Sequence, residues 1–216
     1  MTNKIKQKDD SKDGKDGKSD KQKYASLGKR FVAFVVDILI ISFVATIICI
    51  PFSNVENTNK LEDDYLTNTQ DFFDQKISVD DYHEIQISYV YNSAKESGLT
   101  RIVTVILGIL YFGLLQFYMK GQTLGKKFTH IKVKSDDGEL TINQLLFRAL
   151  IVDSIVLDIV LFTSMMFMNK STYYYGALIF ELIQYVIYFV CMIMIIKSKE
   201  NKGLHDVLFH TSVVEE

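Results

Sequence analysis

Four long apolar runs alternate with charged stretches along the 216-residue chain. They cover residues 31–52, 102–118, 149–168 and 173–196 and are rich in Ile, Leu, Val, Phe, Met and Tyr. Each is close to the ~17–25 residues that a helix needs to cross the hydrocarbon layer of a bilayer. The runs are apolar on all sides, unlike the one-sided stripe of a soluble bundle helix. The pattern predicts an all-α integral membrane protein with four transmembrane helices.

The segment before the first run differs sharply in composition. Residues 1–23 carry eight lysines and five aspartates with a single isoleucine. Such a segment cannot bury enough apolar surface to order itself, so we predict a disordered, charged tail. The first apolar run is too long for a cleaved signal peptide. No aromatic residue is interleaved among these lysines, which argues against a nucleic-acid partner.

The charges of the connecting segments predict the orientation of the chain. Lysine and arginine cluster before the first run, in the connection 119–147 and, as Lys197, Lys199 and Lys202, at the start of the segment 197–216, whereas residues 54–100 hold ten acidic residues against three lysines. Basic loops stay on the cytoplasmic side of a membrane. We therefore expect an extracellular acidic loop at 54–100 and cytoplasmic segments at 119–147 and 197–216. Both termini would lie on the cytoplasmic side of the cell membrane.

Polar and apolar residues alternate in the inner connection, FTHIKVKSDDGELTINQ. This pattern predicts a cytoplasmic β-hairpin that turns at Asp137 and Gly138. Two short strands are marginal alone, so the hairpin is expected to pack on the C-terminal segment, where residues 212–214 are a candidate third strand. The acidic outer loop contains enough Tyr, Ile and Val for an amphipathic element, whose type the pattern leaves open.

No motif in the sequence indicates catalysis, a metal or a cofactor. The four histidines share no metal-ligand spacing, and Cys49 and Cys191 fall near opposite ends of their helices, too far apart for a disulfide. The glycines of KGQTLGKK lack the spacing of a phosphate-binding loop. A nucleophile elbow, an HExxH motif and paired catalytic carboxylates are all missing from the loops. We predict neither enzyme activity nor a bound metal or cofactor.

Four carboxylates fall inside the predicted membrane helices: Asp37, Asp153, Asp158 and Glu181. A charge at a helix centre costs ~2.5–3.5 kcal/mol on insertion scales. Arg30 precedes Asp37 by seven residues and Arg148, the cation at the inner face, precedes Asp153 by five. Neither spacing lets the two side chains meet on one helix. We therefore expect contacts between helices, with Asp37 facing a guanidinium of another segment or a wet cavity.

Three interpretations of these carboxylates stay open. They form a fixed ionic network that sets helix register, a path for protons or for cations such as Na⁺, or a site for a lipid head group or small polar molecule. Asp158 and Glu181 are the better transport candidates, because no arginine is expected at their depth. Four helices make a thin wall around a pathway, so transport would favour a homo-oligomer. The opposing class is a non-transporting scaffold or accessory subunit.

Three segments of the chain resemble the RDD family of bacterial membrane proteins: YAS before Arg30, GQTLGKKFTHIKVKSDDGELTINQLLFRAL, and KGLHDVLFHTSVV. That family is named for one arginine and two aspartates. The resemblance places the arginine on Arg30, the first aspartate on Asp37 and the second on Asp206, with Asp153 as a rival. It implies a membrane domain over residues 24–214 and suggests transport, with sodium/proton exchange proposed for some members.

The C-terminal part of the resemblance carries a structural expectation. At the inner membrane face Asp206 would pair with Arg30 or Arg148, and charge-assisted bidentate pairing favours arginine over lysine there. Such a pair would make the C-terminal segment a clasp beneath the helices. The ending LFHTSVV departs from the small-residue stretch typical of the family, which weakens any inference about its local packing.

Overall fold

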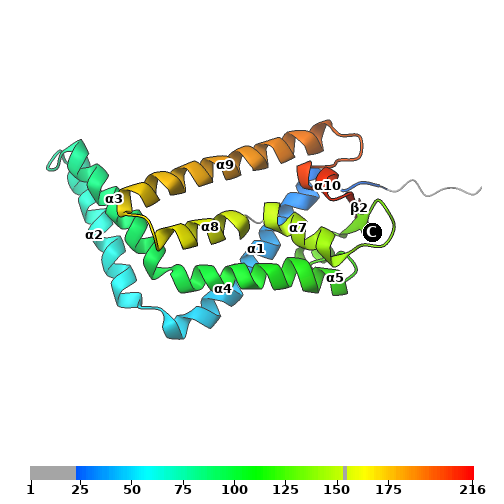
Figure 1. The fold of residues 1–216 in the computed structure, drawn as a ribbon, viewed down its shortest axis with the longest axis horizontal. Helices are drawn as coiled ribbons and strands as arrows, with labels where there is room; N and C mark the ends of the chain where they lie inside the picture. Colours follow the sequence, from blue (N-terminus) through cyan, green and yellow to red (C-terminus); the bar gives the residue numbers. More distant parts are fainter. Residues whose placement is uncertain (1–22, 153–154) are drawn as a thin grey trace, which may run out of the picture.

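Four helical segments make up the body of the molecule; the first, in blue, runs obliquely to the long axis, and the other three lie roughly along it (Figure 1). The structure, a computed structural model, describes residues 23–152 and 155–216. The four segments are α1 (Leu27–Cys49) with η1 (Ile50–Phe52); α4 (Gly98–Gly108) with η2 (Ile109–Leu115) and α5 (Gln116–Tyr118); α7 (Ile142–Val152) with α8 (Ile155–Met165); and α9 (Lys170–Lys197).

The prediction of four membrane-spanning helices is confirmed in part. Three helices of the described residues are long and apolar enough to cross a membrane: Leu27–Phe52, Gly98–Tyr118 and Lys170–Lys197. Within the described residues, the predicted run 149–168 takes in the end of α7 and all of α8, each of 11 residues. Residues 153 and 154 between them lie outside the described part of the chain. At ~1.5 Å per residue each helix covers ~16 Å, about half of the hydrocarbon layer. Together the two helices still lead the chain from one end of the molecule to the other (Figure 1).

The predicted outer loop forms a helical hairpin of α2 (Val55–Phe73) and α3 (Val79–Glu96). At the start of α3, the Ser78 hydroxyl accepts a hydrogen bond from the Asp81 amide at 3.1 Å, and the Asp81 carboxylate accepts one from the Ser78 amide. This capping box fixes where the second helix begins. Stacked aromatic rings join the two helices, with Tyr65 and Tyr89 centroids 4.1 Å apart. We call this end of the molecule the hairpin end (Figure 1).

The predicted β-hairpin is wrong. Strand β1 (Ile131–Ser135) pairs antiparallel with β2 (Thr211–Glu215), so Val133 lies opposite Val213. The C-terminal segment proposed as a third strand is therefore the direct partner. The expected return strand is absent because Thr141 and Gln144 form a reciprocal N-terminal cap, with Gln144 Oε1 accepting from the Thr141 amide at 3.0 Å, and α7 follows at once. This two-stranded sheet defines the sheet end.

Each strand of the sheet is preceded by a short helix, and the two helices have five residues each. Helix α6 (Leu124–Phe128) leads to β1 and α10 (Leu204–Leu208) leads to β2. The residue before each strand is a histidine with positive φ, 54° at His130 and 50° at His210. The two units pair with each other through their strands, and residues Tyr24 and Ala25 add a third stretch of backbone against β2. The start of α1 is thus fastened to the C-terminal strand.

Candidate functional site

Three charged residues from three helices meet at the sheet end. Arg30 lies in the first turn of α1, Arg148 in α7 and Asp206 in the first turn of α10. Arg30 Nη1 donates a hydrogen bond to Asp206 Oδ2 at 2.5 Å, and Arg148 Nη1 donates to Asp206 Oδ1. The Asp206 side chain is 0% exposed. We call these three residues the ion cluster; the carboxylate expected to pair with one arginine binds both.

Backbone and hydroxyl groups extend the ion cluster into the neighbouring elements. The Gly203 amide donates to Asp206 Oδ2 at 3.0 Å, Arg148 Nη1 also contacts the Thr211 hydroxyl at the start of β2, and Arg30 Nε donates to the Ala25 carbonyl at 3.3 Å. The cluster therefore joins α1, α7, α10 and β2. Because these contacts bridge up to 176 positions in sequence, they hold the two ends of the domain together.

The ionisation of the cluster follows from its surroundings. Burial alone would raise the pKa of Asp206, but the charges of Arg148 and Arg30 and the Gly203 amide outweigh it and hold that pKa well below its usual range. Burial lowers the pKa of His205 to about 3, against the opposing charge of Asp206. At neutral pH the imidazole is therefore uncharged. Its Nε2 lies 3.5 Å from Asp206 Oδ1.

Asp37 is buried among neutral donors rather than beside an arginine. Its carboxylate is 1% exposed and accepts hydrogen bonds from Tyr111 Oη at 2.6 Å, Thr123 Oγ1 at 2.5 Å and the Gly125 amide at 2.7 Å. The expectation of a guanidinium partner is corrected, since two hydroxyls and a helix-start amide satisfy the carboxylate. The alternative expectation, a cavity beside Asp37, agrees with the place of Asp37 in the lining of a cavity of about 570 Å³. We call Asp37, Tyr111, Thr123 and Gly125 the α6 anchor, because they attach the start of α6 to α1.

A π-helical segment supplies the tyrosine of the α6 anchor. Seven residues of η2 are wound as a π-helix, a form frequent at functional sites. Tyr111, Phe112 and Gly113 follow one another in this segment and are all buried. Gly113 packs so closely against Leu146 of α7 that a Cβ would overlap the leucine side chain. Tyr111 of this segment reaches Asp37, and Gly113, two residues later, lies against α7.

The carboxylates of the hairpin-end half are held loosely. Asp158 Oδ1 lies 3.7 Å from Arg101 Nη1, and the Asp158 side chain is 38% exposed. The prediction that no arginine lies at the depth of Asp158 is therefore wrong: α4 begins four residues before its apolar run and so places Arg101 beside α8. Glu181 is exposed on α9. Asp153 lies outside the described residues.

The larger cavity of the described chain adjoins the ion cluster. Its volume is about 570 Å³, within the range of typical ligand sites. Arg30, Asp37, Lys126, Arg148 and His205 line it together with apolar side chains of α1, η2, α7, α9 and the sheet. A cavity beside Asp37 was one of the two expectations from the sequence, whereas the presence of Lys126 and His205 in its lining was not predicted.

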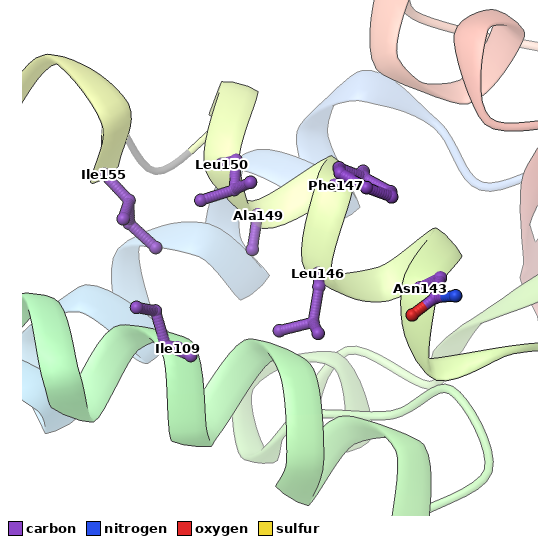
Figure 2. Close-up of a pocket in the computed structure, with 7 residues that line it drawn as sticks. All are labelled: Ile109, Asn143, Leu146, Phe147, Ala149, Leu150 and Ile155. Carbon is purple, nitrogen blue, oxygen red and sulfur yellow. The ribbon is translucent and has the colours of Figure 1, made fainter.

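A smaller cavity lies between η2 and α7, beside the break before α8 (Figure 2). Its volume is about 260 Å³. Figure 2 shows Leu146 pointing from α7 toward the helix that carries Ile109, and Ile155 pointing toward Ile109 from α8. Asn143 is the single polar residue among the seven that line the cavity, so it offers no set of ion ligands. We interpret it as imperfect packing at the junction of two helices.

A family model described as the RDD family matches residues 24–210. The chain belongs to the RDD family. The resemblance found in the sequence is thereby confirmed, and the match covers both the ion cluster and the α6 anchor. No curated protein and no solved structure matches the chain.

Two of the residues on which the RDD resemblance rests, Arg30 and Asp206, touch each other, and the third, Asp37, belongs to the adjacent α6 anchor. Asp206 therefore fits the second family aspartate geometrically, while its rival Asp153 lies outside the described residues. In the part of the RDD chain that the structure describes, no group of three His, Cys, Asp or Glu side chains is placed to hold a metal ion.

Proposed function

We propose that this RDD protein is a non-enzymatic accessory subunit or scaffold of the cell membrane. The exposure of Glu181 carries the proposal. Glu181 lies 11 residues into α9, so at ~1.5 Å per residue it is ~16 Å from the helix start, near the middle of a bilayer core. A carboxylate that touches acyl chains there costs ~2.5–3.5 kcal/mol. A second polypeptide that covers Glu181 removes this cost.

The face of α9 around Glu181 suits such a partner. Leu178, three residues before Glu181, and Tyr185, four residues after it, share its face of the helix and are exposed. Leu182, the next residue along the chain, is exposed as well. Two copies of this chain about a twofold axis along the membrane normal would bring two Glu181 carboxylates together, which like-charge repulsion opposes. The expected partner is therefore a different membrane helix that offers a hydrogen-bond donor at this depth.

Photo-crosslinking in cells tests the accessory role. A photoreactive amino acid at Leu182 should give one adduct of discrete mass that persists in Glu181→Gln and is lost in Glu181→Leu, because only glutamine keeps a polar contact. The same probe at Phe43, exposed on α1, is the matched control and should give no such adduct. An adduct unaffected by Glu181→Leu, or no adduct at Leu182, contradicts the proposal.

A second candidate function is movement of protons or Na⁺, and one observation favours it. Asp158 lies 3.7 Å from Arg101, and Glu181 lies on α9, which packs against α8, so this part of the bundle holds two carboxylates against one arginine. In proteoliposomes, cation-driven pH changes that fall in Asp158→Asn and Glu181→Gln at equal protein level would establish transport. Silence of the parent protein across Na⁺, K⁺ and Li⁺ gradients supports the accessory role. A transport pathway would also require a homo-oligomer to complete its wall.

The proposed orientation places both termini in the cytoplasm, as the lysines at the two chain ends favour. It requires α7 and α8 to act as one interrupted crossing, the fourth of the domain. Reporter fusions after Glu216 and inserted at Gln75, in the turn between α2 and α3, test this. The first should report a cytoplasmic position and the second an external one; the same side for both would contradict four crossings.

A further inference from the structure

The larger cavity has charged side chains at the end next to the sheet and a wall that is mostly apolar, although Asp37, Gln116 and Lys126 also line it. Arg30, Arg148 and His205 line the end next to the sheet. Phe31, Phe34, Phe112, Met192 and Ile195 supply much of the remaining wall. Tyr188 and Ile195 are seven residues apart on α9, so the cavity follows that helix for ~10 Å. One end therefore lies at the level of the helix termini, and the rest extends along apolar membrane helices.

The polar end holds a donor that the protein does not satisfy. Among the described residues, Arg30 Nη2 is buried without a hydrogen-bond partner, although Nη1 and Nε of the same guanidinium are both bonded. A buried, unsatisfied donor on a charged group is costly, and a ligand acceptor would remove that cost. Guanidinium groups suit phosphate and carboxylate oxygens best.

The charge balance around the cavity is positive. Arg30, Arg148 and Lys126 contribute three cations. Asp206, which is bonded to both arginines, and Asp37, which is bonded to neutral donors, contribute two carboxylates. The buried His205 adds no charge at pH 7. Three cationic side chains and two carboxylates at or beside the cavity favour an anionic ligand over a cationic one.

We propose that the cavity binds an anionic membrane phospholipid, with its phosphate at Arg30 Nη2 and one acyl chain along the apolar wall between α1 and α9. The depth of the polar end matches the head-group level of the cytoplasmic leaflet in the proposed orientation. A volume of about 570 Å³ accommodates a head group and the first part of one chain. The apolar wall distinguishes this ligand from a free phosphate, which would leave most of the cavity unfilled.

Glycine positions give a matched pair of variants. Gly28 is exposed and also lines the cavity, so it lies at the rim, and a Cβ there meets nothing within 4 Å. Gly176 of α9 has equally open surroundings and does not line the cavity. Gly28→Phe places a ring at the cavity rim without touching the ion cluster. Gly176→Phe is the control for the cost of an added ring.

Thermal unfolding and native mass spectrometry of the full chain in detergent provide the measurement. Dioleoyl phosphatidylglycerol should raise the melting temperature and remain bound, with ~10-fold preference over dioleoyl phosphatidylcholine, equivalent to about 1.4 kcal/mol. Gly28→Phe should weaken this binding at least tenfold, and Gly176→Phe should leave it unchanged.

Each other outcome overturns a stated part of the proposal. Equal retention of the two lipids would show that the net charge does not select the ligand. Equal stabilisation by glycerol phosphate or inorganic phosphate would identify a free phosphate as the ligand and remove the acyl chain. Undiminished binding in a folded Gly28→Phe would place the lipid elsewhere. If Gly28→Phe fails to fold, the comparison of lipids in the parent protein still decides.

Discussion

The two ends of the molecule handle polar groups in opposite ways. At the sheet end, Asp206 and Asp37 are almost completely buried and accept hydrogen bonds from several elements. In the half toward the hairpin end, Asp158 is 38% exposed with one arginine at 3.7 Å, and Glu181 is exposed. The two carboxylates that join segments distant in sequence are thus the ones with a full set of hydrogen-bond donors. Those toward the hairpin end retain capacity for other partners.

This difference separates structural from functional charges in the chain. A buried carboxylate with a complete set of donors is difficult to protonate or to offer to a passing cation. The hairpin end itself depends on aromatic packing, with Phe72 and Tyr82 centroids 4.4 Å apart. We therefore expect mutations at the sheet end to affect stability, and mutations of Asp158 and Glu181 to affect interactions.

The largest effect is expected for Asp206→Asn. Removing the charge leaves the guanidiniums of Arg30 and Arg148 buried next to each other without a counter-ion. Loss of one partner of a buried ion pair costs ~3–5 kcal/mol. The free energy of unfolding, measured in mixed SDS micelles, should fall by this amount, and membrane yield should fall with it.

A double variant sharpens the test of the ion cluster. Arg148→Gln added to Asp206→Asn removes one of the two unpaired cations, so the double variant should be more stable than the sum of the single losses predicts. Strict additivity of the two changes would show that Arg148 and Asp206 do not act together.

Gly125→Ala should produce the next largest loss, because it separates α6 from α1. A Cβ at this position would overlap the Ala33 carbonyl and lie 2.7 Å from Asp37 Oδ1. Such overpacking costs ~1–3 kcal/mol. Gly28→Ala is the control, at an exposed position of α1 where the added methyl has open space, and its change should stay within about 0.5 kcal/mol. Equal effects of the two alanines would contradict the α6 anchor.

His205 predicts how acid affects the sheet end. The pKa is about 3 in the folded chain and ~6.5 in an unfolded one, so the unfolded state binds more protons between these values. Stability should therefore fall as pH decreases below about 6.5, by up to ~1.4 kcal/mol per pH unit. Asp206, whose folded pKa is depressed, adds its own loss only below its unfolded pKa of ~3.9.

Unfolding measured between pH 7 and pH 4.5 isolates the histidine. His205→Gln carries no titrating group and should show a flatter dependence on pH than the parent, whatever its stability at pH 7. Parallel curves for the two proteins would mean that His205 is protonated in the folded state.

Much of the helical architecture was predictable, because apolar runs of membrane length leave few alternatives. The error in the sheet has a specific cause: Asp137-Gly138 is a strong turn signal, but Thr141 and Gln144 form a helix cap that ends any return strand. The sequence contained this signal as TINQ. It also contained the repeat of Leu124 and His130 at Leu204 and His210, eighty positions later, which indicates two equivalent helix–strand units.

The charged residues of the candidate site were predictable from the sequence, because charged residues are rare in and next to the apolar runs. Arg30, Asp37 and Asp206 were identified from family resemblance, and Arg148 from its place at a helix start. Tyr111, Thr123 and Gly125 were missed as partners of Asp37, because hydroxyls and backbone amides are common along the chain and none of these residues stands out in the sequence. No local pattern in the sequence locates a contact of this kind across 74 to 88 positions.

The smallest effect on stability is expected for Asp158→Asn. This variant tests the comparison of the two ends in the half toward the hairpin end. The pair with Arg101 is long and both side chains are partly exposed, so its contribution is ~0–1 kcal/mol. Unfolding of Asp158→Asn in mixed micelles should nearly match the parent, whereas Asp37→Asn, measured alongside it, should be clearly destabilised because an amide replaces an acceptor that faces three donors. If Asp158→Asn costs as much as Asp37→Asn, Asp158 is as structural as the sheet-end carboxylates, and the division between the two ends is wrong.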